Sequence, residues 1–170
     1  GIVMFDHLQG KLVEQLGQPP PMKILVVDLG GEVDTIEFNK KADLWTKNLA
    51  KEAKITQAVK LIKEGIAQNA PKLIGEAASI SSIANQAILH KPGLEKLLEV
   101  VLDNGGYGIN VAHSGTVIGI LLDQDDDRLL EWPYLVRSTL ESNVSFFWTR
   151  LIGGGLEPII NGSQEAWCNL

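Results

Sequence analysis

The sequence predicts an α+β sandwich with the split order βαββαβ, in which an antiparallel sheet carries helices packed on one face. Three observations lead to this fold class. A short apolar run follows a proline cluster, a long stretch of helical periodicity comes next, and two further apolar runs are joined by a tight turn. The length of 170 residues suits one globular domain or two small ones.

The first 21 residues predict a lead-in segment. They contain a short amphipathic stretch that stops at Gly17 and at the prolines 19–21, which lack backbone N–H groups. The β-branched run Met22–Asp28 then lies between Pro21 and Gly30-Gly31, as a buried strand would. It is the first predicted strand.

Helical spacing of apolar residues extends from about Ala42 to Leu102. Pro71 and Pro92-Gly93 divide this stretch into three predicted helices, because proline cannot continue a helix. Asn104-Gly105-Gly106 ends the third helix.

The remaining elements complete the split order. Residues 107–113 alternate as a half-buried strand, and residues 116–122 are apolar on both faces, as in a central strand. A helix over 129–140 and a strand over 144–151 follow. The predicted organisation is a lead-in segment at 1–21, one domain at 22–152 and a tail at 153–170.

Composition excludes several classes of function. Fifteen Lys and Arg against 21 Asp and Glu give a net charge of −6, which argues against a nucleic-acid partner. The single cysteine, Cys168, forms no intrachain disulfide and indicates a reducing compartment. No apolar run approaches the ~20 residues of a membrane span, so we expect no membrane partner and a cytoplasmic location.

The segment Gly105–Gly119 concentrates small residues, a histidine and hydroxyls around a predicted strand-to-strand turn. Its backbone N–H groups could converge on an anionic ligand, although such turns also serve purely as hairpins. Val111 stands where a dinucleotide fingerprint needs its third glycine, and no Walker loop occurs in the chain. A hydrolase elbow centred on Ser114 would need glycine at 112 and 116, where Ala112 and Thr116 stand.

Three other polar features have structural alternatives. His113 could be a polar group at the mouth of a site or a hydrogen-bonded structural histidine. Asp34 and Thr35, close after the first strand, could contact a polar substrate or cap turns. The acidic run 123–127 lacks the glycine and glutamate of a calcium loop, so it predicts a solvated loop whose last aspartate caps the next helix.

Four segments resemble the C-terminal half of GHMP-type small-molecule kinases. They are GIVMFDHLQGKL from Gly1, MKILVVDLGGEVDTIEFN from Met22, LIGEAASISSIANQAIL from Leu73 and GGYGINVAHSGTVIGILLD from Gly105. The likeness covers the chain to about Leu151 and is most specific in AHSGTVIG. Within the superfamily, the sequence is most similar to the L-threonine kinases of adenosylcobalamin synthesis.

This resemblance implies a ferredoxin-like C-terminal kinase domain that helps to phosphorylate the hydroxyl of L-threonine, or of another hydroxylated amino acid, with ATP. The third motif of the superfamily would form a turn facing the active-site cleft. Its positions here are Gly108, Asn110, Ala112, His113, Ser114, Gly115 and Thr116.

Two departures from the superfamily pattern shape the expected activity. The third motif is poorer in glycine than usual, and the Pro-x-x-x-Gly-Leu-x-Ser-Ser loop that cradles ATP phosphates is absent from this chain. We therefore expect ATP and Mg²⁺ to bind mainly to an N-terminal kinase half, and this chain to be inactive alone, with no catalytic residue and no metal ligand assigned to it. The alternative is a non-catalytic ligand-binding or regulatory domain with the same fold.

Overall fold

The computed structural model describes residues 1–6, 9–31, 43–112, 116–140 and 144–152. Two sheets are present in this part of the chain: a two-stranded β1-β2 hairpin and a four-stranded sheet in the order β4-β5-β3-β6. The strands are β1 (Ile2–Asp6), β2 (Lys11–Gly17), β3 (Met22–Asp28), β4 (Gly108–Val111), β5 (Val117–Asp123) and β6 (Ser145–Leu151). The helices are α2 (Leu44–Ala50), α3 (Glu52–Ala67), α4 (Pro71–Ala84), the 3₁₀ turn η1 (Asn85–Ala87), α5 (Leu94–Asp103) and α6 (Glu131–Leu140).

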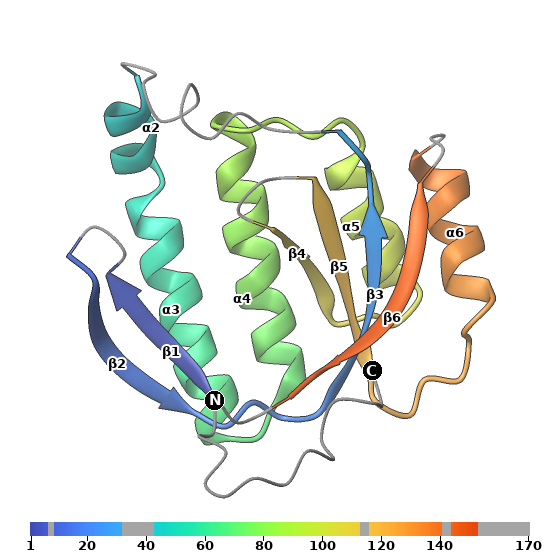
Figure 1. The fold of residues 1–170 in the computed structure, drawn as a ribbon, viewed down its shortest axis with the longest axis horizontal. Coiled ribbons are helices and arrows are strands. Elements are labelled where there is room, and N and C mark those ends of the chain that lie inside the picture. Colours follow the sequence, from blue (N-terminus) through green and yellow to red (C-terminus); the bar gives the residue numbers. More distant parts are fainter. Residues whose placement is uncertain (7–8, 32–42, 113–115, 141–143, 153–170) are drawn as a thin grey trace, which may run out of the picture.

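The predicted split βαββαβ order is confirmed. In the four-stranded sheet every neighbouring pair is antiparallel, and β3 is central, pairing with β5 on one side and β6 on the other. A helical block separates β3 from β4, and α6 separates β5 from β6, which is the ferredoxin-like arrangement. Figure 1 shows α3 and α4 running side by side, with α4 next to β4.

The main core lies between the sheet and the helices α5 and α6. Alternate residues of a strand point to opposite faces, so Leu25 and Val27 of β3 share a face with Ile118, Ile120 and Leu122 of β5. These side chains pack against buried residues of the two helices: Leu94, Leu97, Val101, Trp132 and Val136. Burial of this apolar stripe fixes which face of the sheet the two helices cover.

A smaller cluster holds α4 against the sheet. Met22 and Leu121 point away from the α5 and α6 face and pack with Ile74 of α4. The backbones of α4 and β4 approach closely at Gly75 and Gly108, where a Cβ on either glycine would overlap backbone atoms of the other element. Gly108 also has a φ of +147°, a conformation that side chains disfavour.

Before Pro71 the structure differs from the sequence prediction in two elements. The first residues have amphipathic spacing but form the β1-β2 hairpin, with Gly10 at a φ of +64° in its turn. The stretch predicted as one helix before Pro71 is two, α2 and α3, because the Lys51 amide bonds the carbonyl of Asn48 three residues back and tightens the chain there.

The acidic run is more than a solvated loop. The carboxylate of Asp126 accepts hydrogen bonds from Arg128, at 2.6 Å from Nη2, and from the indole Nε1 of Trp132 at 3.0 Å. Only 8% of the Asp126 side chain is exposed. Asp126, rather than the last aspartate of the run, therefore ties this loop to α6.

These contacts change the acidity of the loop. Burial alone would raise the pKa of Asp126, but the hydrogen bonds from Arg128 and Trp132 outweigh it and hold the pKa at about 2. Nearby, burial and a hydrogen bond to Asp123 raise the pKa of the Tyr107 phenol to about 12. The ionised form of Asp126 is thus part of the folded structure at neutral pH.

Replacing Gly75 with alanine tests the close approach of α4 and β4. Alanine favours an isolated helix by up to about 1 kcal/mol, yet its Cβ would overlap the carbonyl of Tyr107. We expect Gly75→Ala to lower the free energy of unfolding by roughly 1–3 kcal/mol in urea denaturation, as overpacking does. The control, Glu76→Ala at the exposed neighbouring position, should change it little; equal stability of both variants would contradict the close contact.

Asp126→Asn tests the ion pair through pH. The folded-state pKa lies below the ordinary value of 3.8, so the stabilisation is present above pH 4 and is lost as pH falls toward 2. The variant should be roughly 1–3 kcal/mol less stable than the parent near pH 7. Between pH 4 and pH 2 its free energy of unfolding should fall less than that of the parent, because it has no carboxylate at this position to protonate. Asp127→Asn, at the exposed neighbour, is the control. If the free energy of unfolding depended on pH in the same way in the parent and in Asp126→Asn, the stabilising role of the Asp126 carboxylate would be refuted.

Candidate functional site

The end of β3 meets the β4-β5 hairpin, which is distant from it in sequence, at one end of the four-stranded sheet. Asp28, the last residue of β3, pairs with Val117 at the start of β5. Just beyond the strands, the Leu29 amide donates to the Thr116 carbonyl and the Ala112 amide to the Val117 carbonyl, both at 2.9 Å. Thr116 therefore lies beside the chain that leaves β3, and Ala112 lies next to Val117 of β5.

The structure places only some of the predicted site residues. Ala112 and Thr116 flank the turn, and Asn110 is an exposed β4 residue whose side-chain oxygen lies over Gly119. Gly108 lies at the other end of β4, where close packing against Gly75 leaves no room for a Cβ and so requires glycine. The predicted residues Asp34, Thr35, His113, Ser114 and Gly115 lie outside the described residues, and a role at the cleft stays a prediction for the whole set.

Two serines of α4 close the outer edge of β4. The Ile109 and Val111 amides each donate to a serine hydroxyl at 3.0 Å, the first to Ser79 and the second to Ser82. Each hydroxyl also donates onward, Ser79 to the Gly75 carbonyl at 2.8 Å and Ser82 to the Ile109 carbonyl at 3.5 Å. The helix thus supplies the hydrogen bonds that a fifth strand would otherwise make, and it fixes β4 and its turn.

A small polar cavity opens where this edge reaches the turn. Its volume is about 270 Å³, and it is lined by residues from the α2-α3 junction, the end of α4 with η1, and the end of β4: Lys51, Ser81, Ser82, Asn85, Val111 and Ala112. The ammonium of Lys51 donates to Oδ1 of Asn85 at 2.9 Å. Burial lowers the pKa of Lys51 because the cavity solvates its charge poorly.

Sequence reasoning did not identify the lysine, the serines or the asparagine of this cavity. Ser79 and Ser82 were available as a signal, because two hydroxyls three residues apart share a face of an otherwise apolar helix. Lys51 gave no such signal, since a lysine in an amphipathic helix is usually a solvated surface residue. Its position depends on the break between α2 and α3.

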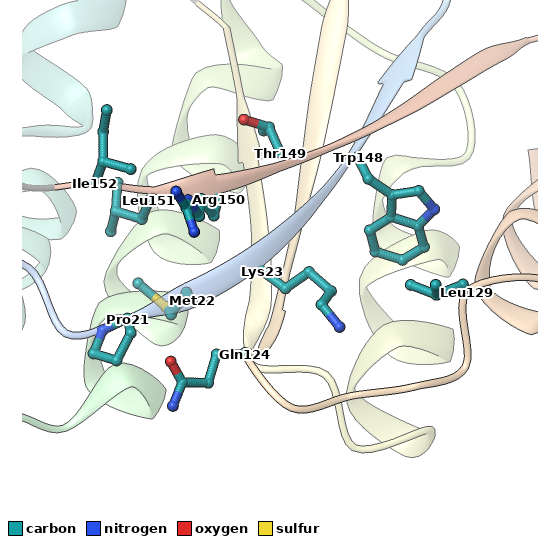
Figure 2. Close-up of a pocket in the computed structure, with 10 residues that line it drawn as sticks. All are labelled: Pro21, Met22, Lys23, Gln124, Leu129, Trp148, Thr149, Arg150, Leu151 and Ile152. Carbon is teal, nitrogen blue, oxygen red and sulfur yellow. The ribbon is translucent and has the colours of Figure 1, made fainter. Parts of the chain in front are cut away.

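Figure 2 shows a larger groove at the opposite end of the sheet, with a volume of about 850 Å³. Its floor includes Met22 and Leu151, which pair across β3 and β6. Met22 is six residues from Asp28 along β3, or about 20 Å at the usual rise per residue, so the groove is separate from the turn. Lys23 and Arg150 face each other across the strands there, and Lys23 donates to the Asp126 carbonyl.

Among the described residues, no group of three or more His, Cys, Asp or Glu side chains could hold a metal ion. Within the same ranges, no helix is both long enough and apolar enough to cross a bilayer.

Comparison with known proteins identifies related kinases. Residues 58–131 match the family described as GHMP kinases C terminal. The chain is 36% identical over 123 residues to an L-threonine kinase of Salmonella typhimurium, covering 72% of this chain and 41% of that protein. It is 28% identical over 161 residues to an L-threonine kinase of Citrobacter freundii, covering 92% of this chain and 54% of that protein.

A solved structure supports the same fold. L. major mevalonate kinase in complex with R-mevalonate superposes with a TM-score of 0.60 at 12% identity, over 86% of this chain and 48% of the kinase. At this identity the likeness concerns the fold alone. The chain thus spans about half the length of the relatives it matches.

Ser82→Ala tests how the β4 edge is held. Removing the hydroxyl leaves the Val111 amide without its acceptor, and we expect a loss of about 1–3 kcal/mol in the free energy of unfolding. Hydrogen exchange should quicken most at the Val111 amide. Ser81→Ala is the matched control, because Ser81 is exposed and lines the same cavity. Unchanged exchange at Val111 in Ser82→Ala would count against the edge closure.

Proposed function

Residues 58–131 belong to the GHMP kinase C-terminal family, and on that premise we propose that the chain is the C-terminal part of an ATP-dependent kinase for a small hydroxylated amino acid. L-Threonine is the proposed substrate, and cobalamin side-chain synthesis the proposed use of its phosphate. The observation that carries this proposal is the 36% identity to an L-threonine kinase, which spans 72% of the chain.

The geometry of the turn end is compatible with this role. A kinase of this kind joins the substrate hydroxyl oxygen to the γ-phosphorus of ATP while the bond from that phosphorus to the ADP oxygen breaks and the hydroxyl loses its proton. Such transfer depends mainly on positioning and on charge stabilisation. The end of β4, held by the α4 serines, and the cavity beside it would supply one wall of a substrate site.

The nucleotide is proposed to bind elsewhere. Mg²⁺, when bound with ATP, neutralises phosphate charge. The described residues offer no cluster of ligands for it, and the chain covers 41% and 54% of the two L-threonine kinases. We assign ATP and Mg²⁺ mainly to an N-terminal kinase half, and with that assignment this chain alone is inactive. A cytoplasmic location goes with the proposal because ATP is the phosphoryl donor.

An ADP-release assay with Mg-ATP and L-threonine tests the proposal. It should be run on this chain and on the product of the full reading frame that encodes it. Turnover is expected only in the longer product, since half of an active-site wall cannot position both reactants. Phosphorus NMR of the product should show L-threonine O-3-phosphate.

Two other outcomes would contradict this function. Turnover by the isolated chain would overturn the division between two halves. No turnover in either protein, with serine and homoserine also tried, would overturn the kinase assignment. A folded chain that then binds an amino acid without ATP would be a non-catalytic ligand-binding domain.

A further inference from the structure

The ammonium of Lys51 has unused hydrogen-bonding capacity at the polar cavity. An ammonium carries three donors, and one of them goes to Asn85 Oδ1 at 2.9 Å. Among the residues that the structure describes, no carboxylate lies within ion-pair distance of Lys51. The lysine is only half-exposed, so water compensates its charge incompletely.

The neighbouring polar groups add donors to the same cavity. Lysine has no acceptor, so Asn85 must present its oxygen to Lys51, which leaves the asparagine NH₂ group free to donate elsewhere. The hydroxyl of Ser81 also lines the cavity. An ammonium, an amide NH₂ and a hydroxyl around one small space form the donor set that suits an anionic oxygen group.

The position of Lys51 is set by the fold. The residue sits at the junction of α2 and α3, where its amide bonds Asn48 and its carbonyl accepts from the Ile55 amide at 3.0 Å. Asn85 follows directly after α4, and α3 packs along α4. Both partners therefore stand on rigid elements, which lowers the entropy cost of holding a ligand.

We propose that this cavity binds the carboxylate of the amino-acid substrate, with Lys51 as the charged ligand and Asn85 as the residue that positions it. The inference rests on the proposed function and adds a specificity determinant to it. The volume of about 270 Å³ is below the usual range for drug-sized ligands and suits a small substrate. Ala112 lines the cavity and directly precedes His113 in the chain, so a carboxylate here lies beside the predicted turn.

Two further observations agree with an anion at this place. Burial lowers the pKa of Lys51, and a bound carboxylate would offset the poor solvation that causes this. At the other end of the sheet, in contrast, the cations of the loop are already bonded, Arg128 to Asp126 and Lys23 to a carbonyl. Arg128 has a carboxylate partner there, whereas Lys51 has none among the described residues.

The test uses the active full-length kinase with Lys51→Met and two substrates. L-Threonine carries the carboxylate, whereas L-threoninamide replaces it with a neutral amide. We expect Lys51→Met to raise the KM for L-threonine roughly ten- to hundredfold with little change in kcat, because an ionic hydrogen bond common to ground and transition states is lost. The KM for L-threoninamide should stay the same, so that the preference for the acid disappears.

Lys54→Met is the matched control. It removes the same charge one turn along α3, outside the cavity, and should leave both KM values unchanged. Lys51→Arg, which keeps a cation, should restore part of the preference for L-threonine. Thermal unfolding of each variant shows whether a change in KM reflects the site or the fold.

Several results would overturn the inference. One is an unchanged KM for L-threonine in folded Lys51→Met. Another is an equal rise in KM for L-threonine and L-threoninamide. A third is a rise in the KM for ATP alone, which would assign the cavity to a phosphate. Each of these leaves an active kinase, so the proposed function would stand. Lack of activity in the unsubstituted full-length protein would instead remove the proposed function, and this inference with it.

Discussion

The site depends on how α4 seals the outer edge of β4. An edge strand exposes N–H groups that must find acceptors, and here two serine hydroxyls accept from Ile109 and Val111. A hydroxyl can accept from one backbone group while it donates to another, so each serine joins the helix and the strand without leaving a polar atom unpaired. Gly75 and Gly108 allow the two backbones to come close enough for these bonds to form.

The cavity is a consequence of that contact. With α4 fixed along β4, the end of the helix lies beside Val111 and Ala112, and α3, packed on α4, brings Lys51 to the same place. The walls therefore come from three segments that are separate in the sequence: Lys51, residues 81–85 and residues 111–112. Farther along, the helix buries apolar side chains against the sheet, so polarity is concentrated at the turn end.

The sequence predicted the elements whose signal is local. Strands β3, β5 and β6 follow from apolar runs bounded by turn residues, and α4 and α5 from helical spacing that Pro71 and Pro92-Gly93 interrupt. The β1-β2 hairpin was missed because its apolar residues also fit helical spacing and four of them, Val3, Phe5, Leu12 and Val13, remain half-exposed. Exposed apolar residues give periodicity little physical weight, since burial is what makes the pattern informative.

The sequence indicated only those residues of the candidate site that are neighbours in the chain. The turn after β4 was found because small residues and hydroxyls cluster there, whereas Lys51, Ser82 and Asn85 meet through the packing of α3 on α4. For Gly108 the motif suggested a ligand contact, which stays a prediction, while its φ of +147° and its contact with Gly75 show a packing role that the sequence did not indicate. Residues that meet only through tertiary packing have no regular spacing in the sequence, so periodicity cannot predict that they lie together.

The charged groups at the two ends of the sheet have different partners, and this difference supports the proposed carboxylate site. At the end of β5, Asp126 binds Arg128 and Trp132, and Asp123 binds Tyr107, so these groups stabilise the fold and have little capacity left for a ligand. At the turn end, Lys51 keeps donors that no described protein group accepts, in a cavity of about 270 Å³. A protein gains nothing in stability from a poorly solvated cation. Its position beside the turn is therefore better explained by a ligand than by the fold.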